Sequence, residues 1–213
     1  MSPPFPTLYA ILDPEQTRLP MLEVADRLTR AGVEIIQLRD KTASPRSIFT
    51  QARELAAFLA PRGVRFILND RPDIARIAGA GGVHVGQEDL PPEDARRICS
   101  APCWVGVSTH NQEQLREAAL TSADYIAVGP IFATATKRNP DPVVGLELLR
   151  AARQMTDKPL VAIGGITLER AADVYRSGAD SIAVIRDLAA AEDPEARARE
   201  WMDLAKRVRP AQI

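Results

Sequence analysis

Residues 33–41, which read V-E-I-I-Q-L-R-D-K, form the stretch that decides how the rest of the sequence is interpreted. The stretch begins with β-branched residues, which favour a short buried strand, and it ends in polar and charged residues. Because alternate side chains of a strand share a face, Gln37, Arg39 and Lys41 are predicted to point the same way. An amide and two cations at the exit of a strand suit a phosphorylated heterocycle. The alternative is a sheet edge with solubilising charges, and this stretch alone favours neither interpretation.

The whole chain alternates short apolar segments with longer amphipathic ones. The apolar segments predict strands at residues 7–12, 34–38, 65–69, 83–85, 104–107, 125–128, 160–163 and 181–185. The amphipathic segments predict helices at residues 20–31, 44–61, 72–78, 91–98, 111–120, 145–155, 167–176 and 194–208. Strand–helix alternation implies parallel strands with right-handed crossovers, and eight units are the number that closes a barrel, whereas an open doubly wound sheet usually has fewer strands. We therefore predict an α/β fold, a single (β/α)8 TIM barrel of eight parallel strands, as one domain over residues 1–213.

A weak internal repeat supports this count. A turn of small residues precedes the second, fourth, sixth and eighth predicted strands, and Asp124 and Asp180 stand at the starts of the last two. Recurrence at every other strand suits a barrel that is layered by alternate strands. Because strand starts form the stability end of such a barrel, we expect structural roles for Asp124 and Asp180.

Composition excludes several classes of protein. The 213 residues are 46% hydrophobic and 26% charged, with a formal net charge of -1, so any anion site must be local, and neither nucleic acid nor a membrane is an expected partner. No apolar run approaches the roughly 20 residues of a membrane span. The N-terminus lacks the basic start and apolar core of a signal peptide. Cys99 and Cys103 are interpreted as reduced thiols, and we expect a cytoplasmic location.

Polar residues gather at the predicted C-terminal ends of the strands, which is where the active sites of such barrels lie. The opposite ends are mostly small or apolar. This asymmetry favours a functional site over solubilising charges. The residues at these ends include Gln37, Arg39, Lys41, Asn69, Asp70, Asp89, Ser108, His110, Thr134, Thr136, Lys137, Gly164, Gly165, Ile185 and Arg186.

Two carboxylates, Asp70 and Asp89, follow adjacent predicted strands. Beside several cations they suggest a magnesium diphosphate, because Mg²⁺ commonly uses one or two carboxylates together with water and phosphate oxygens. An acid/base pair is one alternative, although acid/base chemistry needs no surrounding cations. A helix N-cap is another alternative for Asp70, since Pro72 follows it and a helix is predicted to begin there.

The pair Gly164-Gly165 before a predicted helix favours a phosphate site, in which bare backbone N–H groups face a dianion. A tight turn is the alternative. His84 lies between valines and is interpreted as a packed core residue with a satisfied ring. His110 either carries a proton or hydrogen-bonds its loop, and the scattered tyrosines are interpreted as packing.

Seven motifs, in order and over nearly the whole barrel, closely resemble the thiamine-phosphate synthases. The motifs are Q-L-R-D-K at 37–41, N-D-R at 69–71, G-V-H-V-G-Q-E-D-L at 82–90, G-V-S-T-H at 106–110, G-P-I-F-A-T-A-T-K at 129–137, A-I-G-G-I at 162–166 and G-A-D-S-I-A-V-I at 178–185. The resemblance implies a transferase that joins hydroxymethylpyrimidine diphosphate to hydroxyethylthiazole phosphate and gives thiamine phosphate and diphosphate. It implies dissociative chemistry, in which diphosphate leaves before the thiazole nitrogen attacks, and assistance by Mg²⁺.

The resemblance also implies roles for individual residues. Asp70 and Asp89 would hold Mg²⁺, and Ser108 and Lys137 would be catalytic. The pyrimidine diphosphate would contact Gln37, Leu38, Arg39, Asp40, Lys41, Asn69, Ser108 and Lys137. The thiazole phosphate would contact Thr134, Ala135, Thr136, Gly165, Ile185 and Arg186. Apart from the resemblance, the loop at 132–144 is rich in Thr, Asn, Asp and Pro and long for a barrel loop, so we expect it to close over the diphosphate.

Two residues depart from the family pattern. Members often have glycine where Ser181 stands, a departure that we expect to be harmless at a strand start, and often serine where Arg186 stands. We expect the Arg186 side chain to turn outward and pair with Asp187 or another acidic group, and an ionic contact with the thiazole phosphate is the alternative. Two rival functions are a thiazole tautomerase that uses His110 and a non-catalytic barrel that binds thiamine precursors. The sequence indicates no oligomeric state.

Overall fold

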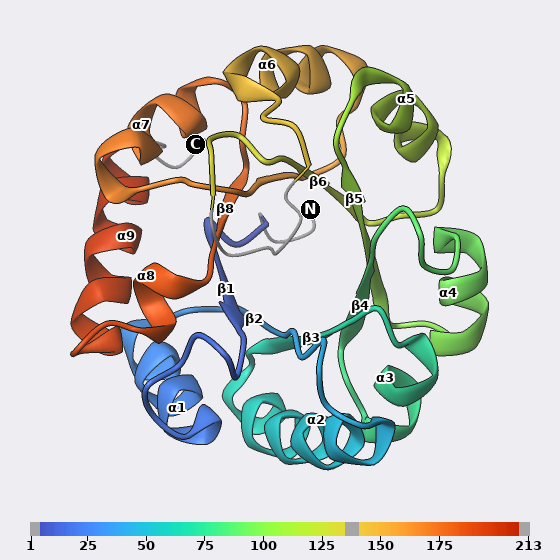
Figure 1. Cartoon of the computed structure of the whole chain (residues 1–213), viewed down its shortest axis with the longest axis vertical. Coiled ribbons are helices and arrows are strands. Elements are labelled where there is room, and N and C mark those ends of the chain that lie inside the picture. Colours follow the sequence, from blue (N-terminus) through green and yellow to red (C-terminus); the bar gives the residue numbers. More distant parts are fainter. Residues whose placement is uncertain (1–4, 135–140, 209–213) are drawn as a thin grey trace.

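The computed structural model describes residues 5–134 and 141–208. Eight parallel strands close into a barrel, and helices surround the barrel on the outside (Figure 1). Each strand pairs with the next along the chain, and β1 pairs with β8 to complete the ring, which confirms the predicted (β/α)8 barrel. The strands are β1 (Leu8–Leu12), β2 (Ile35–Leu38), β3 (Arg65–Asn69), β4 (Gly82–Val85), β5 (Trp104–Thr109), β6 (Tyr125–Val128), β7 (Leu160–Ala162) and β8 (Ser181–Val184).

The helices begin and end close to the predicted residues. One short helix, α8, is not indicated by the sequence, because its four residues complete barely one turn and show no apolar periodicity. It directly follows β8 and begins at Arg186. The helices are α1 (Met21–Ala31), α2 (Pro45–Leu59), α3 (Pro72–Ala78), α4 (Pro92–Cys99), α5 (Gln112–Leu120), α6 (Gly145–Met155), α7 (Leu168–Arg176), α8 (Arg186–Ala189) and α9 (Pro194–Val208), with a 3-10 helix η1 (Ala60–Arg62) after α2.

The barrel wall is apolar on both of its faces. In β1, Leu8, Ala10 and Leu12 belong to the core between the strands and the helices, whereas Tyr9 and Ile11 belong to a second cluster inside the barrel. Burial on both faces explains why the strands read as nearly continuous apolar runs in the sequence. The other buried members of the interior cluster are Ile35, Ile67, Tyr125, Ala127, Val161 and Ala183.

Aromatic side chains fill the N-terminal end of the barrel interior. Phe5, which precedes β1, stacks on Trp104 at the start of β5, with ring centroids 5.3 Å apart. Phe5 also contacts the ring of Tyr125 at 5.3 Å, and the Arg65 guanidinium lies 3.8 Å from the centroid of the Trp104 ring. This packing closes one end of the barrel, so a ligand must enter from the other end.

Asp124 and Asp180 have the structural roles predicted for them. The Asp124 carboxylate accepts hydrogen bonds from a backbone N–H of β5 at 2.7 Å and from Arg96 of α4 at 2.5 Å. Asp180 accepts in the same way from a backbone N–H of β7 at 2.9 Å and from Arg153 of α6 at 2.9 Å. The predicted repeat therefore recurs as one tertiary arrangement that ties a helix to two adjacent strands.

Candidate active site

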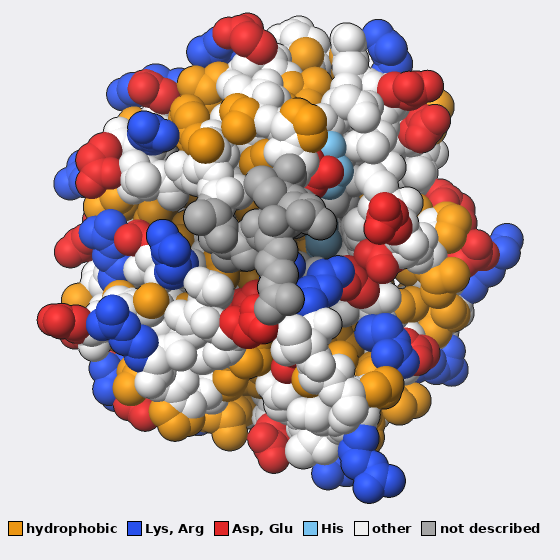
Figure 2. All heavy atoms as spheres, in the orientation of Figure 1, with side chains coloured by type: hydrophobic (Ala, Val, Ile, Leu, Met, Phe, Trp, Pro, Cys, Tyr) orange, Lys and Arg blue, Asp and Glu red, His pale blue; other side chains and the backbone are white. Residues whose placement is uncertain are grey.

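A cavity of about 1810 Å³ opens at the C-terminal ends of the strands. Figure 2 shows this face of the molecule, where charged side chains and histidine gather around the centre. The predicted site residues that line the cavity are Gln37, Arg39, Lys41, Asn69, Asp70, Asp89, Ser108, Thr134, Gly165, Ile185 and Arg186. The predicted residues Ala135, Thr136 and Lys137, and with them the middle of the loop at 132–144, lie outside the described residues.

Two predicted substrate contacts, Leu38 and Asp40, are not brought to the cavity. Leu38 is fully buried in the core between the strands and the helices. Asp40 accepts hydrogen bonds from the backbone N–H groups of Thr42 at 3.1 Å and Ala43 at 2.9 Å, so it shapes the turn after β2. Burial acts to raise the pKa of Asp40, but the hydrogen bonds from Ala43 and Thr42 outweigh it and lower that pKa. The strand alternation that brings Gln37, Arg39 and Lys41 into the cavity directs Leu38 and Asp40 elsewhere.

Two cations at the end of β2 are each paired with a carboxylate. Arg39 Nη1 lies 2.5 Å from Oδ2 of Asp13, which is only 4% exposed. Lys41 Nζ donates to Oδ2 of Asp70. Asp13 was not found from the sequence, although its place directly after β1 was an available signal. Its charge-assisted hydrogen bond orients the Arg39 guanidinium at the rim of the cavity.

The carboxyl groups of Asp70 and Asp89, which follow β3 and β4, lie close enough together for Asp89 to raise the pKa of Asp70. Burial raises the pKa of Asp70, the hydrogen bond from Lys41 lowers it, and the adjacent Asp89 raises it. Asp89 also accepts a hydrogen bond from the backbone N–H of Gly86 at 2.7 Å. Two adjacent carboxylates repel each other unless they share a proton or a cation, so the pair suits a divalent cation with water and phosphate oxygens as further ligands. Within the described residues, no group of three or more His, Cys, Asp or Glu side chains could hold a metal without such ligands.

The structure contradicts the alternative role of Asp70 as the N-cap of α3. The N-cap residue is Arg71, and no side chain forms a capping hydrogen bond there. Asp70 itself has φ of 61°, the left-handed conformation that aspartate tolerates better than most residues. Its backbone N–H donates to the carbonyl oxygen of His84 at 2.7 Å, which holds the end of β3 against β4.

Gln37 and Ser108 are linked through the barrel interior by three buried side chains. Gln37 Nε2 lies 3.0 Å from the hydroxyl of Tyr9, which lies 2.8 Å from the hydroxyl of Tyr125. His84 Nδ1 lies 3.1 Å from the Tyr125 hydroxyl, and His84 Nε2 lies 2.8 Å from Ser108 Oγ. The prediction of a satisfied, buried His84 ring is confirmed, but His84 also lines the cavity. The interpretation of Tyr9 and Tyr125 as packing alone is wrong, because their hydroxyl groups belong to this chain.

On the other side of the cavity, two glycines make a sharp turn after β7. Gly164 has φ of 98° and Gly165 has φ of 62°. A Cβ atom at Gly165 would lie 2.3 Å from the carbonyl oxygen of Ala133 and 2.8 Å from that of Phe132. Glycine is therefore required both by the backbone conformation and by the close approach of the neighbouring segment.

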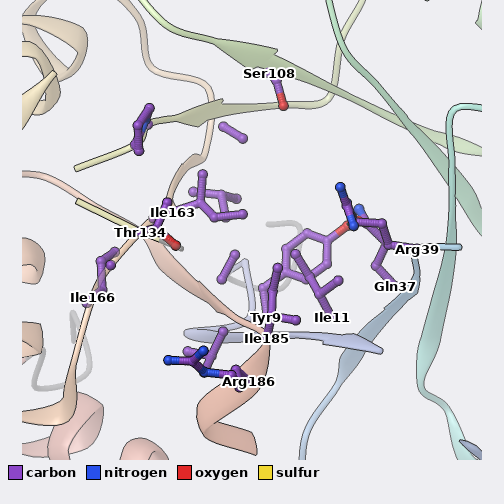
Figure 3. Close-up of a pocket in the computed structure, with 18 of the residues that line it drawn as sticks. Tyr9, Ile11, Gln37, Arg39, Ser108, Thr134, Ile163, Ile166, Ile185 and Arg186 are labelled. Carbon is purple, nitrogen blue, oxygen red and sulfur yellow. The ribbon is translucent and has the colours of Figure 1, made fainter. Parts of the chain in front are cut away.

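Arg186 lines this second side of the cavity with an exposed side chain. Figure 3 shows it on the same side as Thr134 and Ile166, away from Gln37 and Arg39. The expected pair with Asp187 is not formed, because the Asp187 carboxylate accepts instead from Arg197 at 2.8 and 3.0 Å and from Trp201 Nε1 at 2.7 Å. Arg18, which sequence reasoning did not find, also lines this side with an exposed side chain.

His110 hydrogen-bonds its loop, as one of its two predicted roles requires. Its Nδ1 lies 2.6 Å from the carbonyl oxygen of Gly129, and a carbonyl oxygen can only accept, so Nδ1 carries a proton. Its Nε2 lies 3.6 Å from Oδ2 of Asp141, and its backbone N–H donates to Gln114 Oε1 at 2.7 Å. These contacts fix the ring at the rim of the cavity.

The fold and this site define a class of protein, a (β/α)8-barrel enzyme with two differently built sides at one mouth. Comparison with known proteins gives the particular family. The family described as thiamine monophosphate synthase matches residues 8–188. The chain therefore belongs to the thiamine-phosphate synthase family, and it is a transferase.

Individual relatives match over most of their length. A thiamine-phosphate synthase of Koribacter versatilis is 51% identical over 204 residues, which are 93% of this chain and 95% of the relative. One of Xanthobacter autotrophicus is 42% identical over 91% of this chain and 92% of the relative. A solved thiamine phosphate pyrophosphorylase from Pyrococcus furiosus superposes with a TM-score of 0.86 at 33% identity, over 95% of this chain and 96% of that one.

Two further findings concern the helices and the cysteines. Among residues 5–134 and 141–208, no helix is long and apolar enough to cross a membrane. Cys99 and Cys103 are free thiols, as interpreted from the sequence.

Substitution of Gly165 tests its close approach to the carbonyl oxygens of Ala133 and Phe132. We expect Gly165→Ala to lower the free energy of unfolding more than Gly63→Ala does, by about 1–3 kcal/mol, because the new Cβ meets two carbonyl oxygens. Gly63 is the matched control, since it has φ of 70° and open space around its Cβ position. The loss of unfolding free energy in Gly63→Ala therefore measures the cost of the backbone conformation alone. Urea unfolding measures both variants, and equal losses would contradict the steric role of Gly165.

Proposed function

We propose that this chain joins hydroxymethylpyrimidine diphosphate to hydroxyethylthiazole phosphate, which releases diphosphate and gives thiamine phosphate. Membership of the family supports this reaction. The observation that carries the proposal is the contact of Asp70 with both Asp89 and Lys41 at one side of the mouth. Paired carboxylates beside a cation match a diphosphate that binds together with a divalent metal ion.

The pyrimidine diphosphate occupies the side formed by β2 to β5. Gln37 and Ser108, whose side chains are held from inside the barrel, contact the heterocycle. Arg39, Lys41 and Asn69 at the rim contact the diphosphate. The cations neutralise charge that grows on the leaving group, and such preorganised charges are usually the largest contribution to catalysis.

Asp70 and Asp89 would hold Mg²⁺ on this side. Their proximity fits Mg²⁺, which usually binds through one or two carboxylates together with water and substrate phosphate oxygens. Within the described residues, no further His, Cys, Asp or Glu side chain completes a cage of protein ligands around the pair. When bound, Mg²⁺ supplies additional positive charge next to the diphosphate oxygens.

The thiazole phosphate occupies the opposite side. Gly165, with the turn before α7, presents backbone N–H groups for the phosphate, and Arg186 adds a guanidinium. Thr134 and Ile185 also line the cavity and contact the thiazole phosphate.

The reaction on this geometry is a dissociative substitution. The bond between the pyrimidine methylene carbon and the diphosphate oxygen breaks, and its electron pair leaves with the diphosphate. The amino group of the ring stabilises the resulting cation, and the lone pair of the thiazole nitrogen forms the new carbon–nitrogen bond. The chain holds the two substrates in line and neutralises the departing charge, and no general base is needed.

Purified protein, both substrates and Mg²⁺ test the proposal. We expect diphosphate and thiamine phosphate in equal amounts, and only when both substrates are present. Binding of both substrates without turnover would indicate a carrier instead, and isomerisation of a thiazole phosphate alone would indicate a tautomerase. Either result would overturn the proposed reaction.

Asp89→Asn tests the metal assignment. We expect kcat to fall at least about a hundredfold and the dependence on Mg²⁺ to weaken, because several kcal/mol of charge stabilisation are typical of such an ion. Asp73→Asn is the matched control, since Asp73 is exposed and pairs with Arg71 outside the cavity. A magnesium dependence equal to that of the unmodified protein would exclude Asp89 as a ligand.

Arg186→Ser tests the cation that departs from the family pattern. We expect KM for the thiazole phosphate to rise about tenfold at low ionic strength, because a charge-assisted hydrogen bond is lost, and the difference to shrink in salt. KM for the pyrimidine diphosphate should stay constant. Arg176→Ser on α7, where Arg176 pairs with Asp173, controls for net charge. If neither KM changes, the Arg186 side chain takes no part in binding.

A further inference from the structure

The buried side chains between Gln37 and Ser108 form an uninterrupted series of hydrogen bonds with a definite direction. Tyr9 and Tyr125 are 2% and 0% exposed, and burial raises the pKa of each hydroxyl well above its usual range. Both hydroxyl groups therefore keep their single proton, so each can donate only one hydrogen bond.

The direction follows from the rule that every buried hydroxyl proton meets an acceptor. Gln37 Nε2 can only donate, so the Tyr9 oxygen accepts from it. Within the described residues, Tyr125 is the other hydrogen-bonding neighbour of the Tyr9 hydroxyl, so we assign the Tyr9 proton to the bond with Tyr125. The Tyr125 oxygen accepts that bond, and its own proton is directed to His84 Nδ1. Nδ1 therefore carries no proton, the imidazole ring is neutral, and the ring proton is on Nε2.

The two ends of the series present opposite hydrogen-bonding groups to the cavity. His84 Nε2 donates to Ser108 Oγ, so the Ser108 proton remains available for a ligand. At the other end the amide nitrogen of Gln37 is used by Tyr9, so Oε1 remains as an acceptor. Figure 3 shows Gln37 beside the Tyr9 ring and the Ser108 hydroxyl directed from β5 toward the same cavity.

We propose that Tyr9, Tyr125 and His84 are positioning residues that fix an acceptor at Gln37 and a donor at Ser108. This polarity matches a heterocycle that carries an amino group and an unprotonated ring nitrogen, and it rejects the analogue with a ring carbonyl in place of the amino group. The inference rests on the proposed function for the identity of the heterocycle. The reverse direction would present an amide N–H₂ at Gln37 and would select the carbonyl analogue instead.

The local structure is built to hold the series in place. The Tyr125 ring covers the backbone of Gly106 on β5, where an added Cβ would lie 2.0 Å from Cζ of the ring. Only glycine at this position lets the ring lie flat enough against β5 to bring its hydroxyl between Tyr9 and His84. The Tyr9 and Tyr125 rings also pack edge to face, with centroids 5.8 Å apart.

The position of the ring proton on His84 is the first test. The chain has two histidines, so the ¹⁵N NMR spectrum of histidine-labelled protein contains the ring nitrogen signals of His84 and His110 alone. The signals that remain in a His110→Asn variant belong to His84. We expect a neutral His84 with a protonated Nε2 and an unprotonated Nδ1, and Tyr125→Phe should shift the Nδ1 resonance. A proton on Nδ1 would overturn the proposed direction.

Selectivity is the second test. We expect Tyr9→Phe to lower the ratio of kcat/KM for the amino substrate over the carbonyl analogue at least about tenfold, because the freed Gln37 amide can turn its N–H₂ group to the ring carbonyl. A merely structural role would reduce both values equally. Tyr175→Phe is the matched control, because the buried Tyr175 hydroxyl donates to the carbonyl oxygen of Thr7 at 2.8 Å, away from the cavity.

The outcomes separate this inference from the proposed function. An unchanged ratio in both Tyr9→Phe and Tyr125→Phe would overturn the positioning role, whereas turnover by the unmodified protein would still stand. Absence of turnover in the unmodified protein would overturn the proposed function. The proton position on His84 would still decide the direction of the series, because its measurement needs no substrate.

Discussion

Closure of the eight-stranded ring is the constraint on which the other features of this molecule depend. The register sets Ile11 of β1 beside Gln37 of β2, and Gln37 beside Ile67 of β3. Tyr9 therefore lies one layer below Gln37, and its long side chain reaches up to the amide. The same closure brings Tyr9 against Tyr125, which is 116 residues away in the chain. In an open sheet, side chains of β1 and β6 would not meet across an enclosed interior as Tyr9 and Tyr125 do here.

The interior of the ring changes in character from one end to the other. Aromatic rings of Phe5 and Trp104 fill the N-terminal end. Neutral groups joined by hydrogen bonds occupy the middle, and ion pairs such as Arg39 with Asp13 stand at the rim. A charge at mid-depth would lose most of its hydration, whereas a charge at the rim keeps part of it. A ligand with an uncharged ring and a charged phosphate group matches this order.

The sequence is sufficient to predict the fold, because apolar segments of strand and helix length alternate without a break. The sequence is also sufficient to predict which side chains lie at the rim of the cavity, since strand ends can be located and alternate residues share a face. The alternation rule alone predicts that Gln37 and Leu38 point to opposite faces of the strand. The C-terminal ends of parallel strands meet in a barrel, and on that basis Asp70 and Asp89 are predicted to lie together, as they do.

Other features depend on tertiary contacts that no local pattern encodes. A tyrosine in a strand reads as packing, and only the closed ring shows which group its hydroxyl reaches. The pairing of Arg39 with Asp13 joins the ends of two strands. The expected partner of Arg186 is wrong because Asp187 bonds to Arg197 and Trp201 of α9, a helix whose docking the sequence does not specify.

The central claim is that the mouth holds two anions at once, on opposite sides. Calorimetric titration of the thiazole phosphate into protein saturated with inorganic diphosphate and Mg²⁺ tests this claim most directly. We expect the thiazole phosphate to bind, with a dissociation constant changed by less than about fivefold, the lower end of ordinary coupling between sites. Loss of binding in proportion to the diphosphate concentration would show a single shared anion site and would contradict the claim.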